Sequence, residues 1–257
     1  MFRQSKTKMH DVTLMIKMAG TACNMHCAYC YEHFQDVRHN VGAISSAQDV
    51  INYLRDYIEA ETVFILFHGG EPLLADYSEV EKCLFYIKAN FSKFKVQFQT
   101  NGTLLNDEWI NLFRQFEPNI SLSISLDPAG EADLRCAPTF DYRQRVCRNI
   151  KRYAGAIQNV GVISVAHKFN CRAFEEFMDE LIEYGIKSLT INKIKVSSQL
   201  SEYGISEMRY VELLKRVAIR WIEQQLYKKI RIQPLCALLS DEPNRICIYV
   251  PNDLRRG

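Results

Sequence analysis

The stretch VTLMIKMAGTACNMHCAYCYEHF, residues 12–34, joins an apolar run to three closely spaced cysteines. Its first seven residues, 12–18, are mostly large or β-branched apolar side chains, which predicts a buried strand. Cys23, Cys27 and Cys30 follow that strand with the spacing C-x3-C-x2-C. Because three thiolates on one tight loop can ligate a metal centre, we expect a metal-binding loop directly after the first strand.

The order of strand and helix then repeats along the chain. Apolar and β-branched runs predict five more parallel strands at 62–68, 95–100, 120–126, 160–166 and 188–194. Segments with helical spacing alternate with the strands, at 46–59, 77–91, 107–116, 141–155 and 172–184. We therefore expect an α/β fold, a partial (β/α)6 TIM-like barrel, over residues 1–200. The pattern also fits an open doubly wound sheet, and both folds place function at the carboxyl ends of the strands.

Residues 201–257 do not continue the repeat. A helix is expected at about 206–229, followed by an irregular tail that carries three of the chain's prolines. We interpret this tail as a cover or an appendix of the barrel, not as another βα unit.

The composition excludes several other classes of protein. Of the 257 residues 32 are basic and 30 acidic, a balance that argues against a dedicated nucleic-acid binder. No apolar run reaches the roughly 20 residues of a membrane-spanning helix, and the amino terminus lacks the apolar stretch of a signal peptide. We therefore expect a cytoplasmic protein with no membrane contact. The cysteines number nine, and an odd count without a signal peptide does not indicate a disulfide framework.

Polar residues follow the second, third and fourth strands. The second strand ends in Gly69, Gly70 and Glu71, where glycines let the backbone approach a ligand and a carboxylate can receive an ammonium group. The third ends in QTNG and the fourth in SISLD, which brings more polar side chains to the same edge: Gln99, Thr100, Asn101, Ser125 and Asp127. A Gly-Gly turn with a surface glutamate, and turn-forming roles for Asn101 and Asp127, are the simpler alternatives.

The cysteine spacing, with Tyr29 before the third cysteine, resembles the radical S-adenosylmethionine (SAM) superfamily. The resemblance implies that Cys23, Cys27 and Cys30 hold a [4Fe–4S] cluster whose fourth iron binds SAM. It also implies that an electron from the cluster cleaves SAM to methionine and a 5′-deoxyadenosyl radical.

The same resemblance implies roles for residues at the strand ends. Gly69, Gly70 and Glu71 would bind the SAM amino group, Ser125 and Arg135 its carboxylate or ribose, and Tyr29 would lie near the adenine. Asn101 would contact SAM or shape a turn. Arg143 and Arg145 could take the role given to Arg135, and His167, Lys193 and Lys195 could meet a substrate.

The TNG and SLD segments resemble the branch that includes anaerobic sulfatase-maturing enzymes and peptide-modifying maturases. Members of that branch usually continue into a cysteine-rich SPASM or twitch region with further iron–sulfur clusters. Here only Cys236 and Cys247 lie in the tail, fewer than the four protein ligands of such a cluster. We expect one cluster, in a chain that is either short by nature or truncated.

The expected function is hydrogen-atom abstraction from a peptide or protein side chain, with the catalytic acid or base not assigned. A small-molecule radical enzyme or a glycyl-radical activase is the second interpretation. The third is a zinc-stabilised binding domain that uses the three cysteines with His26 or His33, and buried thiols without a metal are a further alternative. The expected partners are the substrate and an electron donor of the flavodoxin or ferredoxin type. The basic tail, with Arg255 and Arg256, could dock that donor or an acidic leader peptide.

Overall fold

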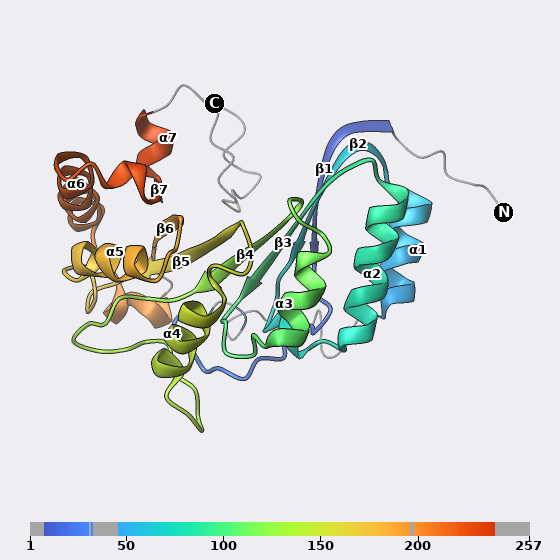
Figure 1. The fold of residues 1–257 in the computed structure, drawn as a ribbon. Coiled ribbons are helices and arrows are strands. Elements are labelled where there is room, and N and C mark those ends of the chain that lie inside the picture. Colours follow the sequence, from blue (N-terminus) through green and yellow to red (C-terminus); the bar gives the residue numbers. More distant parts are fainter. Residues whose placement is uncertain (1–7, 31, 33–45, 196–197, 240–257) are drawn as a thin grey trace.

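The computed structural model describes residues 8–30, 32, 46–195 and 198–239. Its centre is a sheet in which seven parallel strands are hydrogen-bonded in chain order. The strands are β1 (Lys8–Ile16), β2 (Glu59–Phe67), β3 (Lys93–Thr100), β4 (Ile120–Ser125), β5 (Val160–Ala166), β6 (Ser188–Lys193) and β7 (Arg231–Gln233). The sheet is curved but not closed among the described strands, so the expected partial barrel is confirmed (Figure 1).

Helices connect the strands and gather on the outer side of the curved sheet (Figure 1). They are α1 (Ala47–Tyr57), α2 (Tyr77–Asn90), α3 (Asp107–Arg114), α4 (Tyr142–Tyr153), α5 (Phe174–Glu183), α6 (Glu207–Glu223) and α7 (Leu235–Leu239). Short 3-10 helices lie at Pro72–Leu74, Ser198–Tyr203 and Leu226–Lys228. Every helix predicted in the first 200 residues is present, within three residues at each end.

The core lies between the sheet and its helices. In β3, Val96 and Phe98 are buried, and the Phe98 ring lies 4.5 Å from the Phe67 ring of β2. Because side chains alternate along a strand, Gln97 and Gln99 point to the opposite, concave face of the sheet. The concave face of β3 is therefore polar, whereas the helix-facing side is apolar.

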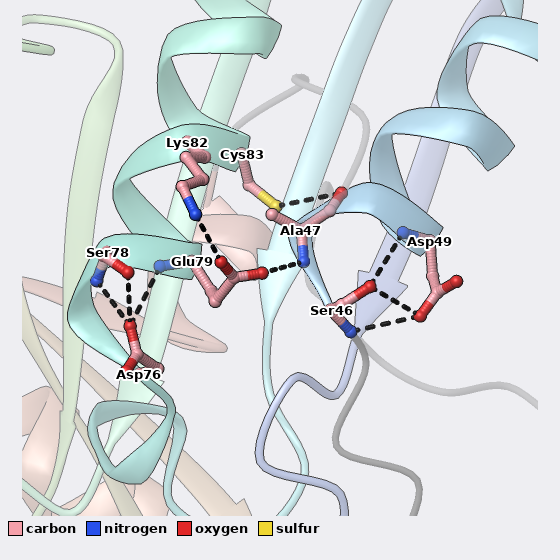
Figure 2. A network of polar contacts seen from close by, with 8 residues as sticks. All are labelled: Ser46, Ala47, Asp49, Asp76, Ser78, Glu79, Lys82 and Cys83. Atoms are coloured by element: carbon pink, nitrogen blue, oxygen red, sulfur yellow. Dashed lines mark hydrogen bonds and ion pairs between the residues drawn. The ribbon is translucent and has the colours of Figure 1, made fainter.

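Two polar contacts join the amino ends of α1 and α2 (Figure 2). Glu79 accepts a hydrogen bond from the backbone N–H of Ala47 at 2.7 Å and pairs with Lys82 at 2.6 Å. The thiol of Cys83 is fully buried and lies 3.9 Å from the Ala47 carbonyl oxygen. Cys83 therefore packs in the core between two helices, away from the cysteine-rich loop.

The expectation for the tail was wrong in one respect. Residues after α6 form β7, which pairs in parallel with β6 and adds a further strand to the sheet. Gln225 adopts a left-handed conformation with φ 54°, which ends the helix before the predicted residue 229. β7 has three residues and Pro234 follows it, so the segment is too short to show strand periodicity.

No helix in the part of the chain that the structure describes is long and apolar enough to cross a membrane. The basic tail with Arg255 and Arg256 lies outside the described residues, and so does Cys247.

Candidate cofactor site

The three clustered cysteines lie on the loop that follows β1. Tight turns shape this loop, with backbone hydrogen bonds from Gly20 to Lys17 at 2.9 Å and from Cys30 to Cys27 at 3.1 Å. Cys27 is buried, and Cys23 and Cys30 are half-buried. We refer to residues 17–30 as the cysteine loop.

The end of β2 holds one side of the cysteine loop. Gly70 N–H donates to the Gly20 carbonyl at 2.9 Å, and Glu71 N–H donates to the Ala22 carbonyl at 2.7 Å. A Cβ atom on Gly70 would lie 2.0 Å from the Ala22 oxygen, and Gly69 has a φ of +111° that suits glycine. The two glycines therefore allow the backbone of β2 to approach the cysteine loop itself.

The segment that contains Arg135 holds the other side of the loop. His26 N–H donates to the Cys136 carbonyl and Ala28 N–H donates to the Leu134 carbonyl, each at 2.8 Å. The cysteine loop is thus fixed by backbone hydrogen bonds to two segments that are distant in sequence.

The thiols of the three cysteines lie close enough to one another to interact electrostatically. Burial, together with the nearby Cys30 and Cys23 thiols, raises the pKa of Cys27 to about 12, while the Arg135 cation opposes this rise. Burial also raises the pKa of Cys23, and the Glu71 and Cys30 charges act in the same direction. Three converging thiols that repel one another as thiolates are a donor set that a cationic centre would stabilise.

Glu71 points into the protein at the carboxyl end of the sheet. Its carboxylate is 1% exposed and accepts hydrogen bonds from Thr100 Oγ at 2.5 Å, Asn101 N–H at 2.6 Å and Leu73 N–H at 3.1 Å. Burial raises the pKa of this carboxyl to about 7, although the three hydrogen bonds lower it. The carboxylate therefore joins the ends of β2 and β3.

Asn101 connects the end of β3 to the first cysteine. Its amide nitrogen donates to Asn24 Oδ1 at 2.8 Å and lies 3.8 Å from the Cys23 sulfur. Its amide oxygen accepts from Thr103 N–H at 2.9 Å, and Thr103 Oγ in turn accepts from Asn24 at 2.9 Å. Asn101 thus shapes a turn, one of its two expected roles, and it also contacts the cysteine loop.

Tyr29, Asp127 and Arg135 form a buried cluster beside Cys27. The Tyr29 hydroxyl donates to Asp127, and the Arg135 guanidinium lies 5.3 Å from the centre of the Tyr29 ring. Arg135 Nε lies 3.2 Å from Asp127 Oδ2 as an ion pair but donates no hydrogen bond within the described part of the chain. Val165 N–H also donates to Asp127, at 2.8 Å, which ties the cluster to β5.

The other candidate arginines occupy different positions. Arg143 donates to the Asp127 carbonyl at 2.5 Å and pairs with Glu180 at 2.6 Å, whereas Arg145 is exposed and lies over the Phe140 ring. Of the three arginines, Arg135 alone is both buried and in contact with Tyr29.

The remaining predicted residues lie near this edge of the sheet. Ser125 ends β4 and is 7% exposed, with no hydrogen-bond partner for its hydroxyl among the described residues. His167 follows β5, is buried, and has its ring 6.1 Å from that of Tyr29. Burial lowers the pKa of His167, against the opposing charge of Asp127. Lys193 pairs with Glu207 of α6.

Comparison with known proteins then decides the family. Residues 19–181 match the sequence profile of the Radical SAM superfamily. The chain belongs to the radical SAM superfamily. The expected family and the expectation of an enzyme are therefore confirmed.

Several curated relatives of this radical SAM chain are known. A serine-type anaerobic sulfatase-maturating enzyme of Bacteroides thetaiotaomicron is 34% identical over 125 residues, which are 46% of this chain and 30% of that protein. A cysteine-type enzyme of Clostridium novyi is 24% identical over 264 residues, which are 93% of this chain and 69% of that protein. An uncharacterized protein of Methanocaldococcus jannaschii is 29% identical over 187 residues, 71% of this chain and 62% of that protein. The chain thus spans only part of the length of these relatives.

Solved radical SAM structures share the fold. Native anSMEcpe with bound AdoMet superposes with a TM-score of 0.73 at 21% identity, over 88% of this chain and 65% of that one. Streptococcus suis SuiB bound to the precursor peptide SuiA gives a TM-score of 0.61 at 19% identity, over 84% of this chain and 47% of that one.

The cluster and SAM implied by the superfamily fit the residues present. Cys23, Cys27 and Cys30 supply three thiols on one loop that interact electrostatically, and the buried Arg135 cation acts on Cys27 beside them. No group of three or more His, Cys, Asp or Glu side chains among the described residues could hold a single metal ion. His33, a zinc ligand in the alternative interpretation, lies outside the described residues, and His26 is exposed.

Sequence reasoning missed two parts of this site. Asn24 lies between the first two cysteines and accepts a hydrogen bond from Asn101. Its position next to Cys23 was the only sign in the sequence that this polar side chain belongs to the site. Leu134 and Cys136 bind the cysteine loop through backbone atoms only, for which the sequence carries no signal.

Proposed function

We propose that this radical SAM enzyme abstracts a hydrogen atom from a peptide or protein side chain. The observation that carries the proposal is the cysteine loop, held on both sides, with three converging thiols beside the buried Arg135. Cys23, Cys27 and Cys30 would hold a [4Fe–4S] cluster. When bound, the cluster and SAM would together supply a one-electron reductive cleavage and a carbon radical that removes the hydrogen atom.

The protein's own residues would place SAM at the edge of the sheet. Arg135 would bind the SAM carboxylate, because a guanidinium has several N–H donors in a planar fork that suits a carboxylate. Asp127 fixes Arg135 by charge and Tyr29 by hydrogen bonding, and so would orient both side chains toward SAM. Ser125 has a hydroxyl free for the carboxylate or ribose.

The backbone at Gly69 and Gly70 would lie near the SAM amino group. Gly70 donates a hydrogen bond to the cysteine loop, and a Cβ atom on Gly69 would lie 2.6 Å from the Gly20 oxygen, so a ligand on the cluster would be close to both residues. Because the Glu71 carboxylate already accepts three hydrogen bonds, we propose that Glu71 acts through the position of its backbone. Asn101 would hold the Cys23 thiol in place.

Two observations support a peptide substrate. Solved relatives of this fold include anSMEcpe with bound AdoMet and the Cp18Cys peptide, and SuiB with its precursor peptide. The concave face of the sheet also carries uncharged hydrogen-bonding groups, such as Gln97 bonded to Ser123, which suit backbone amides of a peptide. The proposal extends to an electron donor of the flavodoxin or ferredoxin type and to work in the cytoplasm.

Anaerobic reconstitution with iron and sulfide tests the chemistry. The reduced wild-type protein should give an electron paramagnetic resonance signal of a [4Fe–4S] cluster that shifts on addition of SAM, and should release 5′-deoxyadenosine. Replacement of any one of Cys23, Cys27 or Cys30 by alanine should remove both, because each supplies one ligand. Cys83→Ala is the matched control and should keep its iron, since that thiol is buried between α1 and α2. Full turnover by a ligand variant, or zinc without iron and sulfide, would refute the proposal.

Peptide modification is tested separately. The reconstituted protein is incubated with SAM and with short peptides encoded beside its gene, and the products are examined by mass spectrometry. A mass change in a peptide supports the proposed substrate class. Parallel incubations replace the peptides by small molecules or by a glycyl-radical enzyme. Modification or activation there, with every peptide unchanged, would refute the proposed substrate class.

A further inference from the structure

Helix α4 carries an unusual concentration of positive charge. Between Tyr142 and Tyr153 it has five basic residues and no acidic residue. The basic residues are Arg143, Arg145, Arg148, Lys151 and Arg152.

Two of these cations have carboxylate partners. Arg143 pairs with Glu180 of α5 at 2.6 Å, and Arg152 pairs with Asp107 of α3 at 2.7 Å. These two residues attach α4 to its neighbouring helices.

The other three, Arg145, Arg148 and Lys151, form what we name the basic face of α4. All three are exposed, and none has a carboxylate within ion-pair distance in the described parts of the chain. Arg145 stacks 3.9 Å from the centre of the Phe140 ring, and Arg148 donates to Gln144 on the same helix at 3.3 Å. The Lys151 ammonium lies 4.8 Å from the centre of the Tyr184 ring. These contacts engage the cationic groups, but none of them is with a neutralising carboxylate.

The next two helices show that this chain does pair charges where helices pack together. Glu175 of α5 pairs with Arg216 of α6 at 2.6 Å, and Asp179 of α5 pairs with Arg220 of α6. The unpaired cations of α4 are thus a feature of its outer face and not of helix packing in general. A surface of one sign attracts a partner of the opposite sign and raises the rate of encounter.

The start of α4 is tied to the cysteine loop. The segment just before α4 binds the cysteine loop through Leu134 and Cys136, and Arg143 in the first turn of α4 donates to the Asp127 carbonyl. In Figure 1 the loop after β1, in blue, passes close to α4 at the lower edge of the sheet. A protein bound to α4 would approach the cysteines from outside and leave the concave face free.

We propose that the basic face of α4 docks an acidic one-electron carrier protein that reduces the cluster. This inference rests on the proposed function, because reductive cleavage of SAM consumes one electron per event. The carrier, a reduced flavodoxin or ferredoxin, loses one electron and the cluster gains it, while no bond forms or breaks between the two proteins. A substrate peptide on the concave face does not compete with this partner.

Charge reversal on the basic face tests the proposal. The variant carries Arg145→Glu, Arg148→Glu and Lys151→Glu, and a control carries the same change of charge at three exposed lysines elsewhere, Lys215, Lys228 and Lys229. Binding of oxidised flavodoxin to each apo-protein is measured by titration calorimetry. Formation of 5′-deoxyadenosine by the reconstituted proteins is measured with reduced flavodoxin and, separately, with dithionite, which needs no docking surface.

For the α4 variant we expect about a tenfold weaker affinity for flavodoxin at an ionic strength of about 0.01 M, where screening extends over about 30 Å. The difference should shrink at about 0.15 M, where the screening length is about 8 Å. The flavodoxin-driven rate should fall in the same proportion, the dithionite-driven rate should not change, and the control should match the wild type.

Three results would overturn the proposal. They are unchanged flavodoxin affinity, an equal loss of the dithionite-driven rate, and loss of peptide binding instead of flavodoxin binding. Failure of the wild type to cleave SAM even with dithionite would refute the proposed function first, and the calorimetric comparison would still show whether α4 binds the acidic carrier.

Discussion

The buried Glu71 carboxyl should make folding stability depend on pH. Its pKa in the folded protein is about 7 against an ordinary value of 4.5, chiefly because burial disfavours the charged form. Between these two values the folded state holds a proton that the unfolded state has released. Stability from this group is therefore complete below about pH 4.5 and is lost as the pH rises through 7. At about 1.4 kcal/mol for each pH unit, the loss is about 3 kcal/mol.

Urea unfolding of the apo-protein at a series of pH values measures this dependence. Glu71→Gln removes the titrating group, so the difference in unfolding free energy between wild type and variant should change by about 3 kcal/mol between pH 4.5 and pH 8, in favour of the variant at high pH. In the variant, the amide nitrogen of the new side chain takes the place of one carboxylate oxygen. It then faces the backbone N–H of Asn101 or of Leu73, and two donors cannot hydrogen-bond to each other. This mismatch lowers the stability of the variant by about 1–3 kcal/mol at every pH, and so does not alter the slope.

The exposed Glu131→Gln variant is the control for loss of one carboxylate as such. A difference between wild type and Glu71→Gln that stays constant over the whole pH range would refute the reasoning, because the carboxyl would then titrate alike in both states.

Three further changes test separate parts of the site. Gly70→Ala should destabilise the protein by about 3 kcal/mol in urea unfolding and prevent cluster assembly, because the new Cβ would lie 2.0 Å from the Ala22 oxygen. Gly155→Ala is the control, since a Cβ there meets no atom within 4 Å, and this variant should assemble its cluster normally. Arg135→Lys should keep the cluster signal but weaken SAM binding about tenfold in equilibrium dialysis, because lysine lacks the planar fork of N–H groups that suits a carboxylate. An unchanged affinity for SAM would show that Arg135 does not bind it. Cys83→Ala should lower stability by about 1 kcal/mol and leave the iron content unchanged, and a loss of iron would show that this thiol is not simply a core residue.

The fold was largely predictable because buried parallel strands leave a strong apolar signal. β5 begins and ends at the predicted residues. β1 was placed four residues too late, since its start at Lys8 depends on pairing with Glu59 and not on apolar side chains. β7 was missed for a similar reason, as only its partner β6 makes its three residues a strand.

The site was predictable in position but not in side-chain direction. The cysteine spacing and the strand ends located the loop and Glu71, because parallel strands end at a common edge. That the Glu71 carboxylate points inward to Thr100 is a tertiary contact, to which the order of residues gives no guide. Asp127 likewise appeared as a turn residue, and only the structure brings Tyr29 and Arg135 to it.

The backbone bonds on both sides of the cysteine loop bear on how the protein would survive loss of its cofactor. Ordering a residue costs about 1–2 kcal/mol, so ordering Cys23–Cys30 costs on the order of 10 kcal/mol. The bonds from Gly70 and Glu71 on one side, and to Leu134 and Cys136 on the other, offset this cost within the polypeptide. Cluster assembly then has little conformational entropy to overcome.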